Sequence, residues 1–143
     1  MFSGMYHNSI DSKGRIIIPS KFREGLGIRF MLTKGLDGCL FLFSTEEWDA
    51  FVAKMKAAPV SSKEGRAFSR YFFANAVECE PDKQGRLTIP PILRAHAGIN
   101  KDLVTIGVDT RIEVWSKKSW ENYNNRPELD TDSIEAKMES LGI

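Results

Sequence analysis

Short apolar runs separated by glycine-containing turns fill the first third of the chain and return in its last third. Runs of this length, rich in β-branched and aromatic residues and bounded by turn residues, are typical of β-strands. They predict strands at residues 15–18, 30–33, 39–43, 86–89, 103–106 and 111–115. A further short β run is expected just before the first strand of each set.

A short helix is expected after the first of these strands in each set. Pro19, and later Pro90 and Pro91, stand where such a helix would begin, and proline at a first helical position loses no hydrogen bond. Gly27 and Gly98 stand where it would end, because glycine readily adopts the left-handed conformation of a helix C-terminus. Each set is therefore predicted to hold about four short strands around one short helix.

A helical segment is predicted between the two sets. Apolar side chains recur there at helical spacing, at Trp48, Phe51, Val52 and Met55. Pro59 ends this pattern, and a capping-box sequence at residues 61–64 opens a second helix. Its aromatic residues are expected to pack in a core or between subunits. Beyond Tyr123 the chain is polar and acidic, and residues 133–141 are expected either to form a weak helix or to stay disordered.

The two sets are copies of one sequence pattern. Residues 11–19 read DSKGRIIIP, and residues 82–90, which lie 71 positions later, read DKQGRLTIP. After one inserted residue the match continues as far as Trp48 and Trp120. Agreement of this length indicates an internal repeat. The predicted units are repeat 1 at residues 5–48, a helical insert at 49–75, repeat 2 at 76–120 and an acidic tail at 121–143.

The repeat has a consequence for the fold. One copy is too small to bury its own apolar faces, whereas two copies could complete each other. We therefore expect a pseudo-twofold unit with interleaved strands. The fold class predicted is mixed α/β, mainly β, with helices between the repeats and near the C-terminus.

The net charge of +1 conceals an uneven distribution. Residues 1–120 carry 18 Lys and Arg against 13 Asp and Glu, which is +5, whereas residues 121–143 carry 2 against 6, which is −4. A basic body is thus joined to an acidic tail. A local basic surface attracts polyanions even when the whole chain is nearly neutral.

Features of enzymes and metal sites are largely missing from the sequence. There is no GxxxxGK[ST] phosphate loop, and neither of the two histidines is paired with a candidate nucleophile. Cys39 and Cys79 lack CxxC spacing and, without a secretory signal, are expected to be reduced thiols in the cytoplasm. No apolar run approaches the ~20 residues of a membrane span. We expect no catalytic residue, no metal, no cofactor and no membrane association.

The repeated Asp-x-x-Gly-Arg turn is the strongest local signal. Asp11 and Asp82 can cap the turn through their side chains, and Gly14 and Gly85 can supply a positive φ. The arginine that ends each turn stands near further polar residues. The candidate DNA-binding residues of the turns are Arg15, Arg86, Lys13, Lys83 and Gln84.

Two interpretations of these arginines stay open at this point. Arg15 and Arg86 could each form an ion pair with the nearby aspartate in a purely structural turn, or they could face DNA. Duplication favours DNA, because paired basic loops suit the repeated phosphates of a duplex and arginine can grip guanine O6 and N7 with two bonds. Arg23 and Arg94, on the short helices, are either part of a solvated face or secondary DNA contacts.

These motifs resemble a known family. The Asp-x-x-Gly-Arg turn followed by a β-rich triplet and proline is similar to the signature of AbrB/SpoVT-type DNA-binding domains, which are swapped-hairpin β-barrels. Two such copies resemble the MraZ family of bacterial transcriptional regulators. Further matching segments are MFSG at 1–4, RAFSRYFF at 66–73, ECEPD at 78–82 and LRAHAG at 93–98. The resemblance covers about residues 1–123.

The resemblance implies a function. Members of this family bind short direct repeats in the promoter of the operon for cell division and cell-wall synthesis, which includes their own gene, and generally repress it. They form rings of several subunits whose basic loops face the DNA. Arg15 and Arg86 match the family's DNA-binding arginine. The protein is accordingly expected to be cytoplasmic and associated with the nucleoid.

A protein-interaction module is the alternative function. AbrB-like folds also serve as antitoxins that hold a partner protein, and the acidic tail at residues 121–143 could be such an arm. Co-purification of a stoichiometric protein partner from cells would favour this alternative over a DNA-binding regulator.

Overall fold

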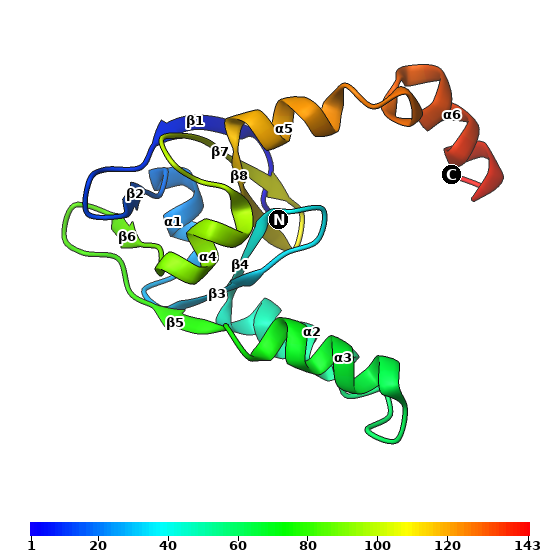
Figure 1. Cartoon of the computed structure of the whole chain (residues 1–143), viewed down its shortest axis with the longest axis horizontal. Coiled ribbons are helices and arrows are strands. Elements are labelled where there is room, and N and C mark those ends of the chain that lie inside the picture. Colours follow the sequence, from blue (N-terminus) through cyan, green and yellow to red (C-terminus); the bar gives the residue numbers. More distant parts are fainter.

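A computed structural model describes the whole chain, residues 1–143, as antiparallel sheets flanked by helices (Figure 1). The strands are β1 (Met5–Ser9), β2 (Arg15–Ile17), β3 (Phe30–Lys34), β4 (Leu40–Ser44), β5 (Val77–Cys79), β6 (Arg86–Thr88), β7 (Asp102–Val108) and β8 (Arg111–Ser116). The helices are α1 (Ser20–Leu26), α2 (Thr45–Met55), α3 (Lys63–Phe73), α4 (Pro91–Ala97), α5 (Lys117–Asn124) and α6 (Thr131–Ser140), with a 3-10 turn at Pro127–Leu129. Each repeat thus holds four strands and one short helix, as its sequence predicts.

Strands of the two repeats are interleaved in one six-stranded antiparallel sheet. Its order is β1-β7-β8-β4-β3-β5, so the first strand of each repeat pairs with the third strand of the other. The central strands β4 and β8 come one from each repeat. When each strand is replaced by its counterpart in the other repeat, the result is the same order read from the opposite edge of the sheet. An internal pseudo-twofold axis requires this symmetry. β2 and β6, again one from each repeat, form a separate two-stranded sheet.

The strands do not close into a barrel, so this part of the fold expected from sequence is wrong. β1 and β5 are the two edges of the large sheet, and β2 and β6 pair only with each other, over three residues apiece. Pro19 and Pro90 follow two residues after these short strands. Because proline has no N–H to donate, neither strand is prolonged to join the larger sheet.

Two apolar layers cover the two faces of the large sheet. The larger is a cluster of 18 buried residues to which α1 and α4 contribute. The smaller lies against α2, α3 and α5 and consists of Cys39, Phe41, Phe43, Phe72, Val104 and Trp115. In β4, Leu40 and Leu42 belong to the first layer, and Phe41 and Phe43 belong to the second. Burial on both faces explains why the sequence of this strand is a continuous apolar run.

Three helices begin at a serine cap. In α2, α3 and α5 the hydroxyl accepts the backbone N–H three residues further on, and the capping residues are Ser44, Ser62 and Ser116. Ser44 and Ser116 occupy equivalent positions at the ends of the two repeats. The internal repeat therefore sets the start of α2 and of α5 in the same way.

Two helical extensions leave the sheets (Figure 1). α2 and α3 lie side by side as a hairpin that points away from the body, and α5 leads from the end of β8 to α6, which projects beyond it. Of the two expectations for the tail, the helix is the one observed, from Thr131 to Ser140. No helix of the chain is both long enough and apolar enough to cross a membrane.

Candidate nucleic-acid interface

The turn between β1 and β2 is organised by one carboxylate. Asp11 Oδ1 accepts hydrogen bonds from the backbone N–H groups of Lys13 and Arg15, both at 2.9 Å, and Asp11 Oδ2 accepts one from Arg15 Nε at 2.7 Å. The Gly14 N–H donates to Asp11 O at 3.0 Å. Gly14 has a φ of 78°, which side-chain-bearing residues rarely adopt. The Asp-x-x-Gly-Arg sequence therefore forms a compact turn closed by its own side chains.

The turn between β5 and β6 repeats this geometry. Asp82 accepts bonds from the N–H groups of Gln84 and Arg86, both at 2.9 Å, and from Arg86 Nε at 2.7 Å. In both turns the backbone N–H of the arginine, assisted by the other donors, holds the pKa of the aspartate below its ordinary value of 3.8. Both aspartates are thus carboxylates at neutral pH.

Each turn arginine is anchored at one nitrogen and open at the other two. Nε of Arg15 and of Arg86 is bound to aspartate, whereas their Nη1 and Nη2 atoms donate to no group of the chain. The two side chains are 25% and 30% exposed. The ion pair of the structural interpretation is therefore present, and it leaves the outer edge of each guanidinium available to a ligand.

The two turns lie at the two ends of one short antiparallel ladder, although they are far apart in sequence. β2 and β6 pair antiparallel between them. The Ile18 N–H donates to Gly85 O at 3.0 Å, and the Ile89 N–H donates to Gly14 O at 2.9 Å, which ties each strand to the opposite turn. In Figure 1 both loops lie on the side of the molecule away from the two helical extensions.

The helix arginines reach the turn of the opposite repeat. A Cβ atom added to Gly85 would clash with Arg23 Nη1, and one added to Gly14 would lie 2.9 Å from Arg94 Cζ. Each guanidinium therefore packs on the bare Cα of a turn glycine. Each turn consequently presents an arginine of its own and a second arginine from the other repeat.

The remaining predicted residues complete a basic surface over the turns. Lys13, Lys83 and Gln84 are exposed there. With the four arginines they bring all seven predicted DNA-binding residues together on the two turns and the short helices that follow. Asp11 and Asp82 are already engaged by their own turns. Such a surface can bind phosphates, and the free arginine edges match the acceptor pairs of guanine.

Two features of this surface were not accessible from the sequence. Asn8 Nδ2 donates to Ile17 O at 2.7 Å and so fastens β1 to β2 beside the first turn. Its counterpart in repeat 2 is Cys79, so comparison of the repeats gives no signal for it. The contacts of Arg23 and Arg94 with the opposite turns depend on the pairing of β2 with β6, which no local pattern specifies.

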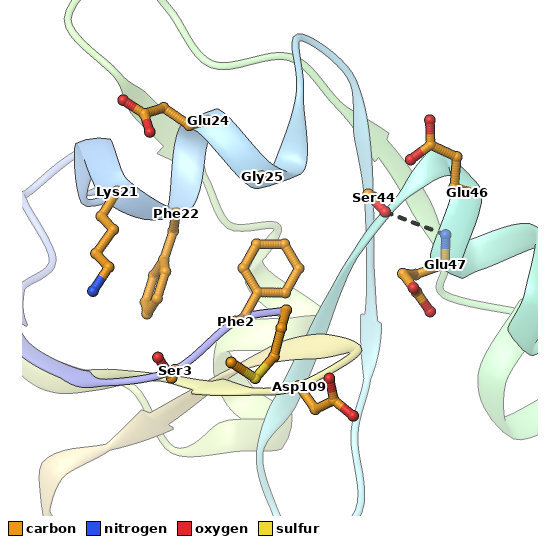
Figure 2. Close-up of a pocket in the computed structure, with 11 residues that line it drawn as sticks. Phe2, Ser3, Lys21, Phe22, Glu24, Gly25, Ser44, Glu46, Glu47 and Asp109 are labelled. Atoms are coloured by element: carbon orange, nitrogen blue, oxygen red, sulfur yellow. Dashed lines mark hydrogen bonds between the residues drawn. The ribbon is translucent and has the colours of Figure 1, made fainter.

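A shallow pocket of about 390 Å³ lies outside this surface, between the N-terminal residues, α1 and the start of α2 (Figure 2). Glu24, Glu46 and Glu47 stand around it. The Phe2 ring packs on Gly25, where an added Cβ would lie 2.5 Å from Phe2 Cε1. These carboxylates repel phosphate, so the pocket does not extend the basic surface.

Comparison with known proteins gives consistent matches over the whole chain. The family model described as "MraZ protein, putative antitoxin-like" matches twice, over residues 1–71 and 72–140. A protein of Acetivibrio thermocellus named transcriptional regulator MraZ is 56% identical over 143 residues, which is 100% of both chains. Proteins of the same name from Caldicellulosiruptor bescii and Thermoanaerobacter pseudethanolicus are 56% and 54% identical, again over 100% of both chains.

Proposed function

This chain belongs to the MraZ family, and from that premise we propose that it regulates transcription as a sequence-specific DNA-binding repressor. Its proposed target is the promoter of the bacterial division and cell-wall gene cluster, which includes its own gene. The operator in this proposal consists of short direct repeats, which the two Asp-x-x-Gly-Arg turns contact.

The pair of turns is the observation that carries the proposal. Two copies of one capped turn are joined through β2 and β6, and each holds an arginine whose Nη atoms are free. Phosphates and base edges recur along a duplex, so a repeated basic loop suits DNA better than it suits a single small anion. Counterion release on contact with lysine and arginine supplies much of the affinity of such an interface.

The residues take different parts in the proposed contact. Arg15 and Arg86 bind base edges, because a guanidinium anchored at Nε still presents two donors in a fixed plane. Arg23 and Arg94, held against the turn glycines, neutralise phosphates. Lys13 of the first turn corresponds to Gln84 of the second, and Ser12 corresponds to Lys83. The two turns therefore need not read the same bases.

We assign the body of the protein to the swapped-hairpin AbrB-like class. The exchange of β1 and β5 between the repeats, together with the crossed pairing of β2 and β6, supports this assignment. In such an arrangement neither repeat has a complete core by itself. The two turns are then held in one fixed relative position, as an interface that reads DNA requires.

A ring-like homo-oligomer is the assembly we propose. Direct repeats orient each bound subunit the same way, which suits cyclic association better than a twofold dimer. Linked subunits bind repeated sites far more tightly than one subunit binds one site, because each later contact forms at high effective concentration. The proposed place of action is the cytoplasm, on the nucleoid.

The test is binding to a duplex from upstream of the protein's own gene. Fluorescence anisotropy compares this duplex with a shuffled duplex of the same composition, and a promoter fusion measures expression with and without the protein. We expect binding to the native duplex to be roughly 100-fold tighter or more, and expression to fall. Equal affinity for the two duplexes would contradict sequence specificity, and unchanged expression would contradict repression.

An antitoxin-like role is the second candidate, and the description of the matching family as antitoxin-like favours it. In this role the acidic tail holds a protein of another sequence. One unrelated protein that co-purifies in stoichiometric amount, and is lost when residues 125–143 are removed, would support it. A chain that purifies alone and still binds its own promoter duplex would exclude it.

A further inference from the structure

α6 carries an apolar face that its own chain leaves open. Ile134, Met138 and Leu141 follow each other at intervals of four and three residues, so they share one side of the helix. They are 44%, 42% and 74% exposed. The helix has 10 residues and packs mainly against the turn Pro127–Leu129. A helix of this length is marginal in water by itself, so its apolar face needs a partner surface.

The distal part of the α2–α3 hairpin, residues 54–70, exposes apolar groups as well. Val60 at the tip is 83% exposed, and Phe68 on α3 is 51% exposed. At the base of the hairpin Phe51 packs edge-on against Phe72, with ring centroids 5.0 Å apart. The hairpin is thus fixed to the body at one end and presents apolar side chains at the other.

The two surfaces are complementary in charge. Residues 54–70 carry five cations against Glu64, a net +4, and the cations are Lys54, Lys56, Lys63, Arg66 and Arg70. Residues 127–143 carry five carboxylates against Lys137, a net −4, and the carboxylates are Glu128, Asp130, Asp132, Glu135 and Glu139. An apolar face with an acidic border thus matches an apolar tip with a basic border. Such complementarity steers association and fixes its orientation.

A second copy of this chain is the partner that fits. α6 and the hairpin tip lie on separate extensions of one molecule (Figure 1), so each chain offers two different surfaces that complement each other. We propose that α6 of each subunit docks on residues 54–70 of the next. This rests on the self-assembly proposed above and names the surfaces that produce it. Head-to-tail contacts of this kind close into rings when the rotation between subunits permits.

The first experiment exchanges the charges and measures the mass of the assembly by light scattering. Glu135→Lys/Glu139→Lys makes the α6 border basic, and Lys56→Glu/Arg70→Glu makes the hairpin border acidic. Each double variant is expected to need a roughly tenfold or higher concentration to assemble, because like charges then face each other. The chain that carries all four changes is expected to recover the wild-type mass.

The second experiment removes the apolar contact. Ile134→Ser/Met138→Ser is expected to lower the assembled mass and leave each subunit folded by circular dichroism, because α6 contributes no buried residue to its own chain. Ile28→Ser is the matched control, since Ile28 is 77% exposed in the loop before β3 and lies on neither surface. The control is expected to assemble like wild type.

The third experiment joins the two surfaces directly. A Met138→Cys chain and a tagged Phe68→Cys chain are mixed and oxidised, and a disulfide between the two chains is expected. Cys39 and Cys79 are buried, and burial raises the pKa of both thiols, that of Cys79 to about 11, so they remain unreactive. Ile28→Cys in place of Phe68→Cys is expected to give no cross-link.

The possible outcomes distinguish failure of the α6–hairpin interface from failure of the proposed self-assembly. A wild-type chain that is monomeric overturns self-assembly, and this interface with it. A wild-type chain that assembles, with variants that keep its full mass, overturns the interface alone. A monomeric chain that holds a different protein on α6 replaces this interface with the antitoxin-like role. Binding of one subunit to one operator repeat is expected to be the same in all these variants, so it reports on the DNA-binding proposal independently.

Discussion

Gly85 is required both for its backbone conformation and for the space that its missing side chain leaves to Arg23. Its φ is 75°, and the guanidinium of Arg23 occupies the place where a Cβ would be. Gly38 has a similar φ of 86°, but a Cβ there would meet open space. Alanine at either position therefore costs stability through strained φ, but only alanine at Gly85 also displaces an arginine.

Gly85→Ala is expected to lower the free energy of unfolding by about 1 kcal/mol through strain at positive φ, and also to weaken DNA binding because Arg23 must move. Gly38→Ala is expected to cost a similar free energy and to bind DNA normally. Urea unfolding and fluorescence anisotropy measure the two effects. Equal losses of DNA affinity in the two variants would contradict the role given to Arg23.

The turn aspartates make a prediction about pH. Their folded-state pKa values are lowered from 3.8, chiefly by the backbone N–H of Arg15 for Asp11 and of Arg86 for Asp82. The stability that each carboxylate contributes is therefore fully present above pH 3.8 and is lost as the pH falls through the lowered value. Carboxyl-carbon NMR titration is expected to give both midpoints below 3.8. A midpoint at or above 3.8 would show that the turn is not closed as described.

The candidate site itself was largely predictable at the residue scale, because a repeated motif marks the same positions twice. The turn arginines, the aspartates and the glycines of both turns follow from the alignment of residues 11–19 with 82–90. The pairing of Arg23 with Gly85 and of Arg94 with Gly14 was not predictable. It arises from contacts between repeats, and sequence spacing carries no information about them.

At the scale of elements, the α2–α3 hairpin is held by aromatic packing at its base. Phe72 is 8% exposed and packs edge-on against Phe51 and Tyr71. Its neighbour Phe73 is 37% exposed and meets Trp48. The two adjacent phenylalanines therefore differ in how much apolar surface they remove from water.

Phe72→Ala is expected to lower the free energy of unfolding by about 3 kcal/mol, because it opens a cavity in the smaller core layer. Phe73→Ala is expected to cost about 1 kcal/mol, since that side chain keeps much of its contact with water. Chemical denaturation of the two variants checks the difference. A loss for Phe73→Ala as large as that for Phe72→Ala would place the hairpin differently on the sheet.

The positions of most elements could be predicted, whereas their pairing could not. Prolines, capping serines and apolar spacing locate the helices, and apolar runs locate the strands. The prediction of a closed barrel was wrong because a barrel depends on which strands share hydrogen bonds. Here β2 and β6 form their ladder only with each other. The apolar spacing at Ile134 and Met138 allowed either a helix or a disordered tail, because a ten-residue amphipathic segment is marginal without a partner.

At the scale of the whole molecule, the interleaved strands make the two repeats one cooperative unit. β1 and β5 each complete the sheet of the other repeat. Leu87 of β6 is 3% exposed and belongs to the larger core cluster, to which both repeats contribute. A substitution in this cluster that lies in one repeat is therefore expected to destabilise the other repeat as well.

Leu87→Ala is expected to lower the free energy of unfolding by about 3 kcal/mol, and the chain is expected to unfold in a single transition. Hydrogen exchange should accelerate to a similar extent in β3 of repeat 1 and in β7 of repeat 2. Two separate transitions, or faster exchange confined to repeat 2, would show that the repeats are independent domains.

The pair of turns is proposed to act as one DNA-binding surface, and the decisive measurement is anisotropy on the native promoter duplex over a series of salt concentrations. Wild type is compared with Arg15→Ala, with Arg86→Ala and with both changes together. Arg126→Ala is the control, because that exposed arginine lies on the acidic tail.

Each single change is expected to weaken binding by about 1–3 kcal/mol, and the double variant to bind more weakly still. Melting temperature and assembled mass should stay as in wild type, because these side chains are partly exposed and only close their own turns. The control should bind normally. Wild-type affinity in the double variant, or an equal loss in Arg126→Ala, would contradict a DNA interface formed by the two turns.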